Sequence, residues 1–340
     1  MSRFRVYQHL PMLKEEGVEG VVSPAVPSAD YGPDGGRKSL GVVLKNGFKT
    51  FTRRVRNLHE LRDYDYVFVQ KTVLPAPFFN MEWRFSRQVK VIFDLDEPIF
   101  LKRPDSSLLG GLWPQERRLL AICRSAHRVV VENSFLAKFV SRAGVDPAVI
   151  PSAIDIKAYE IAGDAKKSPR KIPAVGWIGS QRQQAELRLA TPSLIDLHSR
   201  TPFVVRLIGA TLGAIPARFP IECKPWDLRT EAADLASLDI GLAPREDTEW
   251  NQCCSGLRIL QYWAAGVPVV ASPVGVYSEM VRDGENGFLA GNRDEWTEKL
   301  CLLIKNQELR RKFASEGRRT LQKSYSLPVV SPQLARVFSD

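Results

Sequence analysis

The sequence predicts two successive α/β domains, each built on a parallel sheet with helices on both faces. The chain has 340 residues, too long for one ordinary hydrophobic core and comfortable for two. Short apolar runs rich in β-branched residues alternate with amphipathic segments, which is typical of parallel strands buried on both faces. The alternation breaks at a polar, lysine-rich stretch between residues 155 and 173 and then resumes. We interpret this stretch as an interdomain linker.

The first domain is placed at residues 1–157 and the linker at 158–172. Apolar runs predict its strands at 66–69, 89–93, 128–131 and 149–150. Amphipathic stretches predict helices at 115–126 and 135–143 between the last three strands.

The second domain is placed at residues 173–322. Its strands are predicted at 174–178, 203–208, 240–242 and 267–271. Its helices are predicted at 185–199, 229–237 and 256–265, with amphipathic helices from 294 onward, and a loop is predicted around Trp226. Ligands of such sheets bind beyond the carboxyl ends of the strands, so we expect a site there.

The composition indicates a soluble globular protein, with 44% hydrophobic and 25% charged residues. No apolar run approaches the roughly 20 residues that span a bilayer, and the start of the chain has no signal-peptide core. We therefore expect a cytoplasmic protein. The five cysteines have no spacing typical of zinc, which predicts reduced thiols and no metal site.

The net charge of +10 favours an anionic partner, and part of this charge is concentrated near the start. The basic residues concerned are Arg37, Lys38, Lys45, Lys49, Arg53, Arg54, Arg56 and Arg62. Phe48, Phe51, Val55 and Leu58 add apolar positions at helical spacing. Such a helix binds an anionic membrane surface or packs its apolar stripe on a sheet, and the sequence leaves both open. Nucleic acid is not expected, because no aromatic platform or known binding motif accompanies the charge.

Two turns of the second domain are candidates for binding phosphate. Gly179 and Ser180 follow an apolar strand, where glycine lets backbone approach a ligand. Ser255 and Gly256 precede a helix whose first N–H groups can bind a diphosphate. Arg258 adds a permanent charge in that first turn, and Gln261 follows one turn later.

A third candidate lies in the first domain, where Asp94, Asp96 and Glu97 end a hydrophobic strand. Carboxylates there bind a metal, act as acid or base, or cap the next helix. The sequence leaves these roles open.

These residues together resemble family-4 glycosyltransferases of the GT-B fold, which has two facing Rossmann-like domains. The resembling segments are 176–180, 255–275 and 285–290, with 129–136 and 149–155 upstream. The resemblance implies a metal-independent hexosyltransferase that retains the anomeric configuration, needs no cofactor, and uses a nucleotide-diphosphate sugar as substrate. It implies an acceptor side in the first domain and a donor site in the second, with residues 323–340 returning to the first domain.

Carried over residue by residue, the resemblance assigns roles in the donor site. Gly179, Ser180, Ser255 and Gly256 contact the diphosphate, and the Trp226 loop holds the base. Gln261 reaches the ribose, and Arg182 and Arg258 offset the charge of the leaving diphosphate. Glu279 either binds ribose or phosphate or complements a helix dipole.

Other roles concern the first domain. Asp96, with Asp94 beside it, takes the place where many members have a catalytic His. Together with Arg258 these are the candidate catalytic residues. Arg5, Lys49, Arg53, Arg54 and Arg56 are the candidates for the acceptor or membrane side. This charge fits a peripheral protein at the inner face of the membrane. Such a protein would use a glycan or lipid-linked acceptor in cell-envelope polysaccharide synthesis.

The sequence also departs from the family in three places. Cys253 stands where the first of two spaced Glu residues is common, and the usual basic pair after strand 174–178 is missing. The segment 3–11 resembles one that follows the family's first strand, so we expect an N-terminal domain without that strand.

Two alternatives to a working transferase follow. One is a catalytically impaired GT-B protein that binds a nucleotide sugar or a partner enzyme. The other is a haloacid-dehalogenase-type phosphatase, in which Asp94 attacks phosphate and Asp96 is the acid.

Overall fold

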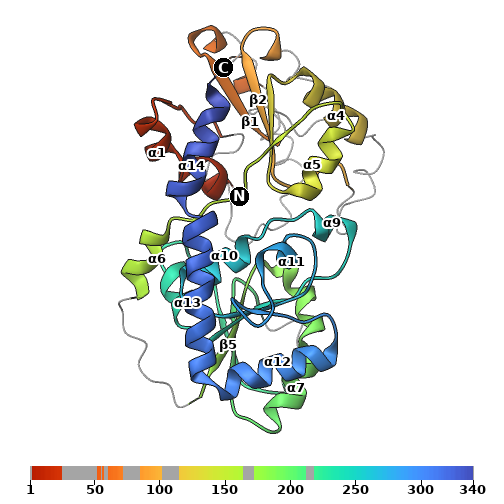
Figure 1. Ribbon diagram of the computed structural model, residues 1–340, viewed down its shortest axis with the longest axis vertical. Helices are drawn as coiled ribbons and strands as arrows, with labels where there is room; N and C mark the ends of the chain where they lie inside the picture. Colours follow the sequence, from red (N-terminus) through yellow and green to blue (C-terminus); the bar gives the residue numbers. More distant parts are fainter. Residues whose placement is uncertain are drawn as a thin grey trace. The chain divides into compact units, whose positions relative to one another are not determined.

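The computed structural model describes residues 2–24, 52–54, 56, 60–71, 85–101, 115–163, 172–211 and 218–339. These residues form two compact units. The N-terminal unit comprises Leu10–Pro151 and Pro332–Asp340 together with Ser2, and the C-terminal unit comprises Arg3–His9 and Ser152–Ser331. Each unit contains one parallel sheet flanked by helices, which confirms the predicted fold class (Figure 1).

The N-terminal unit contains a four-stranded parallel sheet in the order β1-β2-β3-β4. Its strands are β1 (Tyr66–Gln70), β2 (Lys90–Leu95), β3 (Arg128–Val131) and β4 (Ala148–Val149). Its helices are α1 (Leu10–Glu15), the 3-10 turn η3 (Leu61–Asp63), α4 (Gln115–Ser125) and α5 (Ser134–Ser141). β2 is buried from Val91 to Leu95, so the residues that follow it end a core strand. All four strands match the apolar runs of the sequence.

The C-terminal unit contains a six-stranded parallel sheet in the order β10-β9-β8-β5-β6-β7. The strands are β5 (Ala174–Ile178), β6 (Val204–Ile208), β7 (Ile221–Lys224), β8 (Ile240–Ala243), β9 (Val269–Ala271) and β10 (Phe288–Leu289). From β5 the chain builds outward through β6 and β7, and then returns to β8 on the other side of β5. The sheet therefore has a topological switch point between β5 and β8, the place where open α/β sheets bind ligands.

Helices flank this second sheet, and the last of them, α14 (Leu327–Ala335) and the 3-10 turn η7 (Arg336–Phe338), lead back to the N-terminal unit (Figure 1). The others are the π-helix η1 (Arg3–Tyr7), α6 (Ile156–Gly163), the 3-10 helix η5 (Gln181–Leu189), α7 (Thr191–His198), α8 (Glu231–Ala236), α9 (Glu249–Gln252), α10 (Leu257–Ala264), α11 (Val276–Met280), α12 (Arg293–Lys305) and α13 (Gln307–Ser324). α7 and α12 lie side by side, joined by the ion pair between Asp196 and Arg293.

The structure differs from the predicted elements in two places. The single helix expected at 185–199 is a 3-10 helix followed by α7, because Pro192 occupies the first turn of α7 and suits a helix start. An edge strand, β7, precedes the loop predicted around Trp226. The sequence does not predict this strand, because its residues are half-buried or exposed and give no apolar run.

The unit boundaries also differ from the predicted ones. The segment Arg3–His9 and helix α6 belong to the C-terminal unit, although we placed 1–157 in the first domain and began the linker at 158. The rest of the linker, 164–171, lies outside the described residues.

The end of the chain returns to the N-terminal unit, as expected. The Phe338 ring lies 5.8 Å from the Tyr66 ring and 6.0 Å from the Phe68 ring, both on β1. Arg128 donates a hydrogen bond of 2.9 Å to the Ser339 carbonyl. The return begins at Pro332, later than the predicted residue 323.

Candidate functional site

The candidate donor site lies at the switch point of the C-terminal sheet. Gly179 follows β5 and donates its N–H to the Ile208 carbonyl at 3.1 Å. A Cβ on Gly179 would overlap the Trp177 ring and lie 3.2 Å from Nη2 of Arg258. Gly209 follows β6 with φ +83°, and a Cβ there would overlap the Gly179 carbonyl. Glycine is therefore required at both turns, and Gly179 lies against Arg258.

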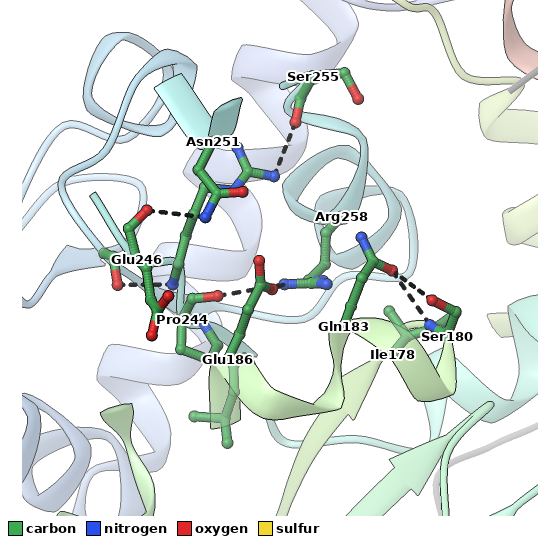
Figure 2. Close-up of polar contacts among 12 residues, drawn as sticks. Ile178, Ser180, Gln183, Glu186, Pro244, Glu246, Asn251, Ser255 and Arg258 are labelled. Atoms are coloured by element: carbon green, nitrogen blue, oxygen red, sulfur yellow. Dashed lines mark hydrogen bonds and ion pairs between the residues drawn. The ribbon is translucent and has the colours of Figure 1, made fainter. Parts of the chain in front are cut away.

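Arg258 projects from the first turn of α10 into a buried position with 8% exposure. Its Nη1 donates a 3.1 Å hydrogen bond to Oε2 of Glu186 (Figure 2). Its guanidinium lies 5.0 Å from the centre of the Trp177 ring. Burial alone would lower the pKa of Arg258, but the nearby Tyr277 and Glu186 raise it above its usual value. The residue is a fixed cation at the carboxyl end of the sheet.

The start of α10 is shaped by Gly256, the residue before its first turn. A Cβ on Gly256 would overlap the Met280 sulfur, so α10 and α11 pack this closely only with glycine. The first N–H groups of a helix have no partner within it, and they favour anions. Ser255 is half-buried beside them. Ser255 and Gly256, which the sequence predicts to bind phosphate, therefore lie at the start of α10.

Sequence reasoning missed a second buried cation, Arg245, which follows β8 after Pro244 and is 7% exposed. Its Nη2 donates to the Ser255 carbonyl at 3.2 Å, a bond that Figure 2 shows at Ser255. Its guanidinium lies 3.8 Å from the centre of the Tyr277 ring. Within the part of the chain that the structure describes, its Nε and Nη1 have no hydrogen-bond partner, nor has the buried Tyr277 hydroxyl. The sequence signal that could have identified Arg245 is its position directly after a buried strand next to the switch point.

Glu231, at the start of α8, holds the neighbouring Trp226 and Tyr159 side chains in place. It is 3% exposed and accepts three hydrogen bonds of 2.7 Å, from Trp226 Nε1, Tyr159 Oη and Arg3 Nη2. Burial would raise the pKa of Glu231, but the bonds from Arg3, Tyr159 and Trp226 lower it below its usual value. Trp226 is 49% exposed although its N–H is fixed. An exposed indole held in this way is a flat surface on which a base can stack.

The other predicted donor residues have different surroundings. Gln261 is 8% exposed and hydrogen-bonds the Tyr159 hydroxyl, and Glu279 is exposed on α11. Gln183 accepts the Ser180 N–H and hydroxyl, both at 3.2 Å, so Ser180 binds phosphate only if Gln183 turns away (Figure 2). The backbone of Arg182 lies in η5, and its side chain is outside the described part.

Cys253 has the properties of a neutral, buried thiol. It is 7% exposed, and burial, followed by Cys254, raises its pKa to about 11. It therefore carries no charge near pH 7 and cannot replace a carboxylate that accepts hydrogen bonds from sugar hydroxyls. All five cysteines are described, and none forms a disulfide.

In the N-terminal unit, Asp94 lies near the end of β2 and Asp96 follows that strand, and both are 0% exposed. Gln70 Nε2 donates to Oδ2 of Asp96 at 2.7 Å. Lys71 Nζ lies 3.9 Å from Oδ1 of Asp96 and donates to Glu97 Oε2 at 2.9 Å. Lys71 has φ +67°, which is uncommon outside glycine and concentrates at functional sites. Sequence reasoning missed Gln70 and Lys71, although β1 and β2 end at the same edge of a parallel sheet.

The phosphatase alternative is not supported by this geometry. A nucleophilic carboxylate must reach its substrate, whereas Asp94 is fully buried and Asp96 is bound by Gln70.

The basic surface predicted near the start of the chain is only partly described. Arg53 donates to the Pro24 carbonyl at 2.9 Å and Arg54 to Ser23 at 3.0 Å, while Arg56 is exposed. Lys49 lies outside the described residues, as do Arg37, Lys38, Lys45 and the four apolar positions. Arg5 is 3% exposed, so it does not form part of an exposed membrane-binding surface, and it belongs to the C-terminal unit.

Among the described residues, no three His, Cys, Asp or Glu side chains are grouped so that they could hold a metal ion. None of the helices formed by those residues has the length and apolar character that crossing a bilayer requires.

Comparison with known proteins finds glycosyltransferases. Residues 255–320 match the family model of the glycosyl transferases group 1. The phosphatidyl-myo-inositol mannosyltransferase of Mycobacterium leprae is 33% identical over 110 residues, which cover 32% of this chain and 28% of that protein. The enzyme of the same name from Mycolicibacterium smegmatis is 23% identical over 98% of this chain and 88% of its own length. The chain spans 61% of the Mycobacterium tuberculosis relatives.

Solved structures resemble this chain along nearly its whole length. Sucrose-phosphate synthase from Thermosynechococcus elongatus has a TM-score of 0.72 at 14% identity, covering 99% of this chain and 92% of its own. HepE of Anabaena, solved with UDP and glucose, has a TM-score of 0.65 at 15% identity, covering 97% and 88%. The fold of these structures and the match at 255–320, which begins at the serine before α10, agree: the chain has the GT-B fold and is similar to the group 1 glycosyl transferases.

Proposed function

We propose that this protein is a glycosyltransferase whose C-terminal unit binds the diphosphate of a nucleotide sugar. The observation that carries the proposal is the position of Arg258, a buried cation in the first turn of α10, in contact range of Gly179. Fixed charge, unpaired helix N–H groups and a close backbone approach are together what a diphosphate needs. The relatives named as mannosyltransferases and the HepE structure with UDP support it.

The transfer itself would depend on stabilising the leaving diphosphate. Negative charge grows on that group as its bond to the sugar breaks, and Arg258 with the start of α10 would offset this charge. The buried charge of Arg258 supports a reaction without a metal. We propose retention at the anomeric carbon by attack on the face from which the diphosphate leaves, without a protein nucleophile. The configuration of the product, determined by NMR, tests retention. Activity in the presence of EDTA tests independence of a metal.

The donor base would stack on Trp226, with Gln261 near the ribose. The fixed indole of Trp226 supports this placement. So does Tyr159, which shares the acceptor Glu231 with Trp226 and hydrogen-bonds Gln261. In the N-terminal unit, Asp96 stays the candidate catalytic carboxylate, with Gln70 and Lys71 holding it in place.

We propose a glycan or lipid-linked acceptor in cell-envelope synthesis, met at the inner face of the membrane. Two observations support it: relatives named for phosphatidyl-myo-inositol, which is a lipid, and the basic residues between 37 and 62. Binding to vesicles with and without anionic lipid tests the membrane part.

A second candidate function is binding of a nucleotide sugar without transfer. The observation that favours it is Cys253, a neutral buried thiol at a place where many family members have Glu.

A panel of nucleotide sugars separates the two functions. Thermal shift reports binding, and release of nucleoside diphosphate, with and without candidate acceptors, reports turnover. We expect one donor to stabilise the protein and to be slowly hydrolysed. Stabilisation without any hydrolysis or transfer would instead support the binding protein, and no response to any donor would contradict both.

A further inference from the structure

Two buried arginines meet at the switch point, but only one of them is paired. Arg258 binds Glu186, whereas Arg245 makes no ion pair with any described carboxylate. Tyr277 joins them: its ring lies under the Arg245 guanidinium, and it is among the groups that raise the pKa of Arg258. The cluster of Arg245, Arg258 and Tyr277 therefore contains two buried positive charges and one neighbouring carboxylate.

Such a cluster is unfavourable unless a further group supplies a counter-charge and hydrogen-bond acceptors. Burying a cation without a counter-charge, and polar hydrogens without acceptors, destabilises a fold. Among the described residues, two nitrogens of Arg245 and the Tyr277 hydroxyl are buried without a hydrogen-bond partner. Proteins keep such groups chiefly where function requires them, because selection removes unneeded strain.

The position of Arg245 indicates which ligand would complete the cluster. Its Nη2 already contacts the Ser255 carbonyl at the start of α10, and Ser255 is half-buried. The unpaired N–H groups of this helix start attract an anion, and guanidinium groups bind phosphate oxygens in pairs of hydrogen bonds. A diphosphate at this place supplies both the missing charge and the missing acceptors.

We infer that Arg245 is a second diphosphate-binding residue of the donor site, with Tyr277 as the platform that holds it. This inference rests on the proposed function and extends it. On binding, the Arg245 side chain exchanges the Ser255 carbonyl for phosphate oxygens, and with Arg258 it supplies the two positive charges that the sequence lacks after β5.

The test compares Arg245→Met with the wild-type protein. Titration calorimetry measures binding of UDP and GDP, ligand-observed NMR measures binding of uridine and guanosine, and thermal melting measures the ligand-free stability. We expect Arg245→Met to weaken the preferred nucleoside diphosphate about tenfold or more, since a charge-assisted hydrogen bond is lost. Binding of the matching nucleoside should not change, and the melting temperature should stay equal or rise.

Three control variants sharpen the comparison. Arg245→Lys keeps the charge and should lose less affinity than Arg245→Met. Tyr277→Phe keeps the ring and should retain the fold. Arg319→Met, an exposed residue of α13 paired with Glu316, should bind as the wild type does.

Three results would overturn the inference. If the wild-type protein binds the diphosphate and Arg245→Met binds it equally well, the inference is refuted while the proposed function stands. A lower melting temperature together with weaker nucleoside binding would show that Arg245 is only a structural residue. If the wild-type protein binds neither UDP nor GDP, the proposed function fails and the inference fails with it.

Discussion

Glu231 shows how one side chain connects several parts of the candidate site. Its carboxylate receives N–H or O–H groups from Arg3 in η1, Tyr159 in α6 and Trp226 after β7, and Tyr159 continues to Gln261 on α10. A buried carboxylate with three donors is held in one orientation, and it holds its partners in turn. We therefore regard it as a positioning residue for the donor base.

Replacing Glu231 by Gln should lower the stability of the protein by about 2 kcal/mol at pH 7, since Arg3 loses its counter-charge. Because the pKa of Glu231 is lowered in the fold, its contribution is present above the unfolded pKa and is lost as the pH falls through the folded pKa. The difference between wild type and variant, measured by urea unfolding, should be largest near pH 7 and shrink below about pH 4.5. A difference that is constant from pH 7 to pH 3 would refute the charge-based role.

Replacing Cys253 by Ser should change donor hydrolysis less than about threefold, because a neutral thiol offers no charge to the reaction. Rates measured from pH 6 to pH 9 should show no ionisation of Cys253, whose pKa is about 11. A large loss of activity, or a limb of the pH profile that disappears in Cys253→Ser, would give the thiol a chemical role.

The sequence identified individual site residues only where one local pattern contained them. Gly179, Arg258 and Gln261 occur in strand-turn-helix segments, so their places could be predicted. Arg245, Tyr277 and Glu231 belong to three other segments, and only the folded sheet brings the first two against α10. For the same reason Gln70 and Lys71 were missed beside Asp96.

At the scale of elements, the packing of α10 on α11 fixes the start of α10, where we propose that the diphosphate binds. Gly256 touches Met280 so closely that no side chain fits between them. The strands were well predicted because buried parallel strands are continuous apolar runs. β7 was not, because Ile221–Lys224 is an edge strand with mostly exposed residues.

Gly256→Ala should displace the start of α10, lower stability by about 2 kcal/mol and weaken nucleoside diphosphate binding. Gly291→Ala is the matched control, because a Cβ there meets only ordinary contacts. Adding Met280→Ala makes room for the new methyl group and should restore binding in part. If Gly256→Ala binds as tightly as Gly291→Ala, the start of α10 is not the phosphate site.

At the scale of the whole molecule, the chain crosses between its two units more often than the sequence indicates. Arg3–His9 belongs to the C-terminal unit, and the chain returns to the N-terminal unit at Pro332. Neither crossing has a local signal, since both depend on contacts distant in sequence, such as Arg3 with Glu231 and Phe338 with Tyr66. Residues 255–320 alone match the family model, yet the fold extends over both units.

Phe338→Ala should destabilise the N-terminal unit by about 1–2 kcal/mol, because its ring packs on two aromatic residues of β1. Hydrogen exchange should show faster exchange in β1 and β2 with little change in β5 and β6. Equal changes in both sheets would mean that the returning segment does not belong to one unit.

The central claim is that the first turn of α10 and Arg258 bind the donor diphosphate, and titration of the preferred nucleoside diphosphate into wild type and Arg258→Ala tests it most directly. We predict that the wild-type protein binds and that Arg258→Ala binds about 100-fold more weakly, with a similar or larger loss of turnover. Arg319→Met should match the wild type in both. Equal affinity and turnover in Arg258→Ala, in a protein that remains folded by circular dichroism, would contradict the account.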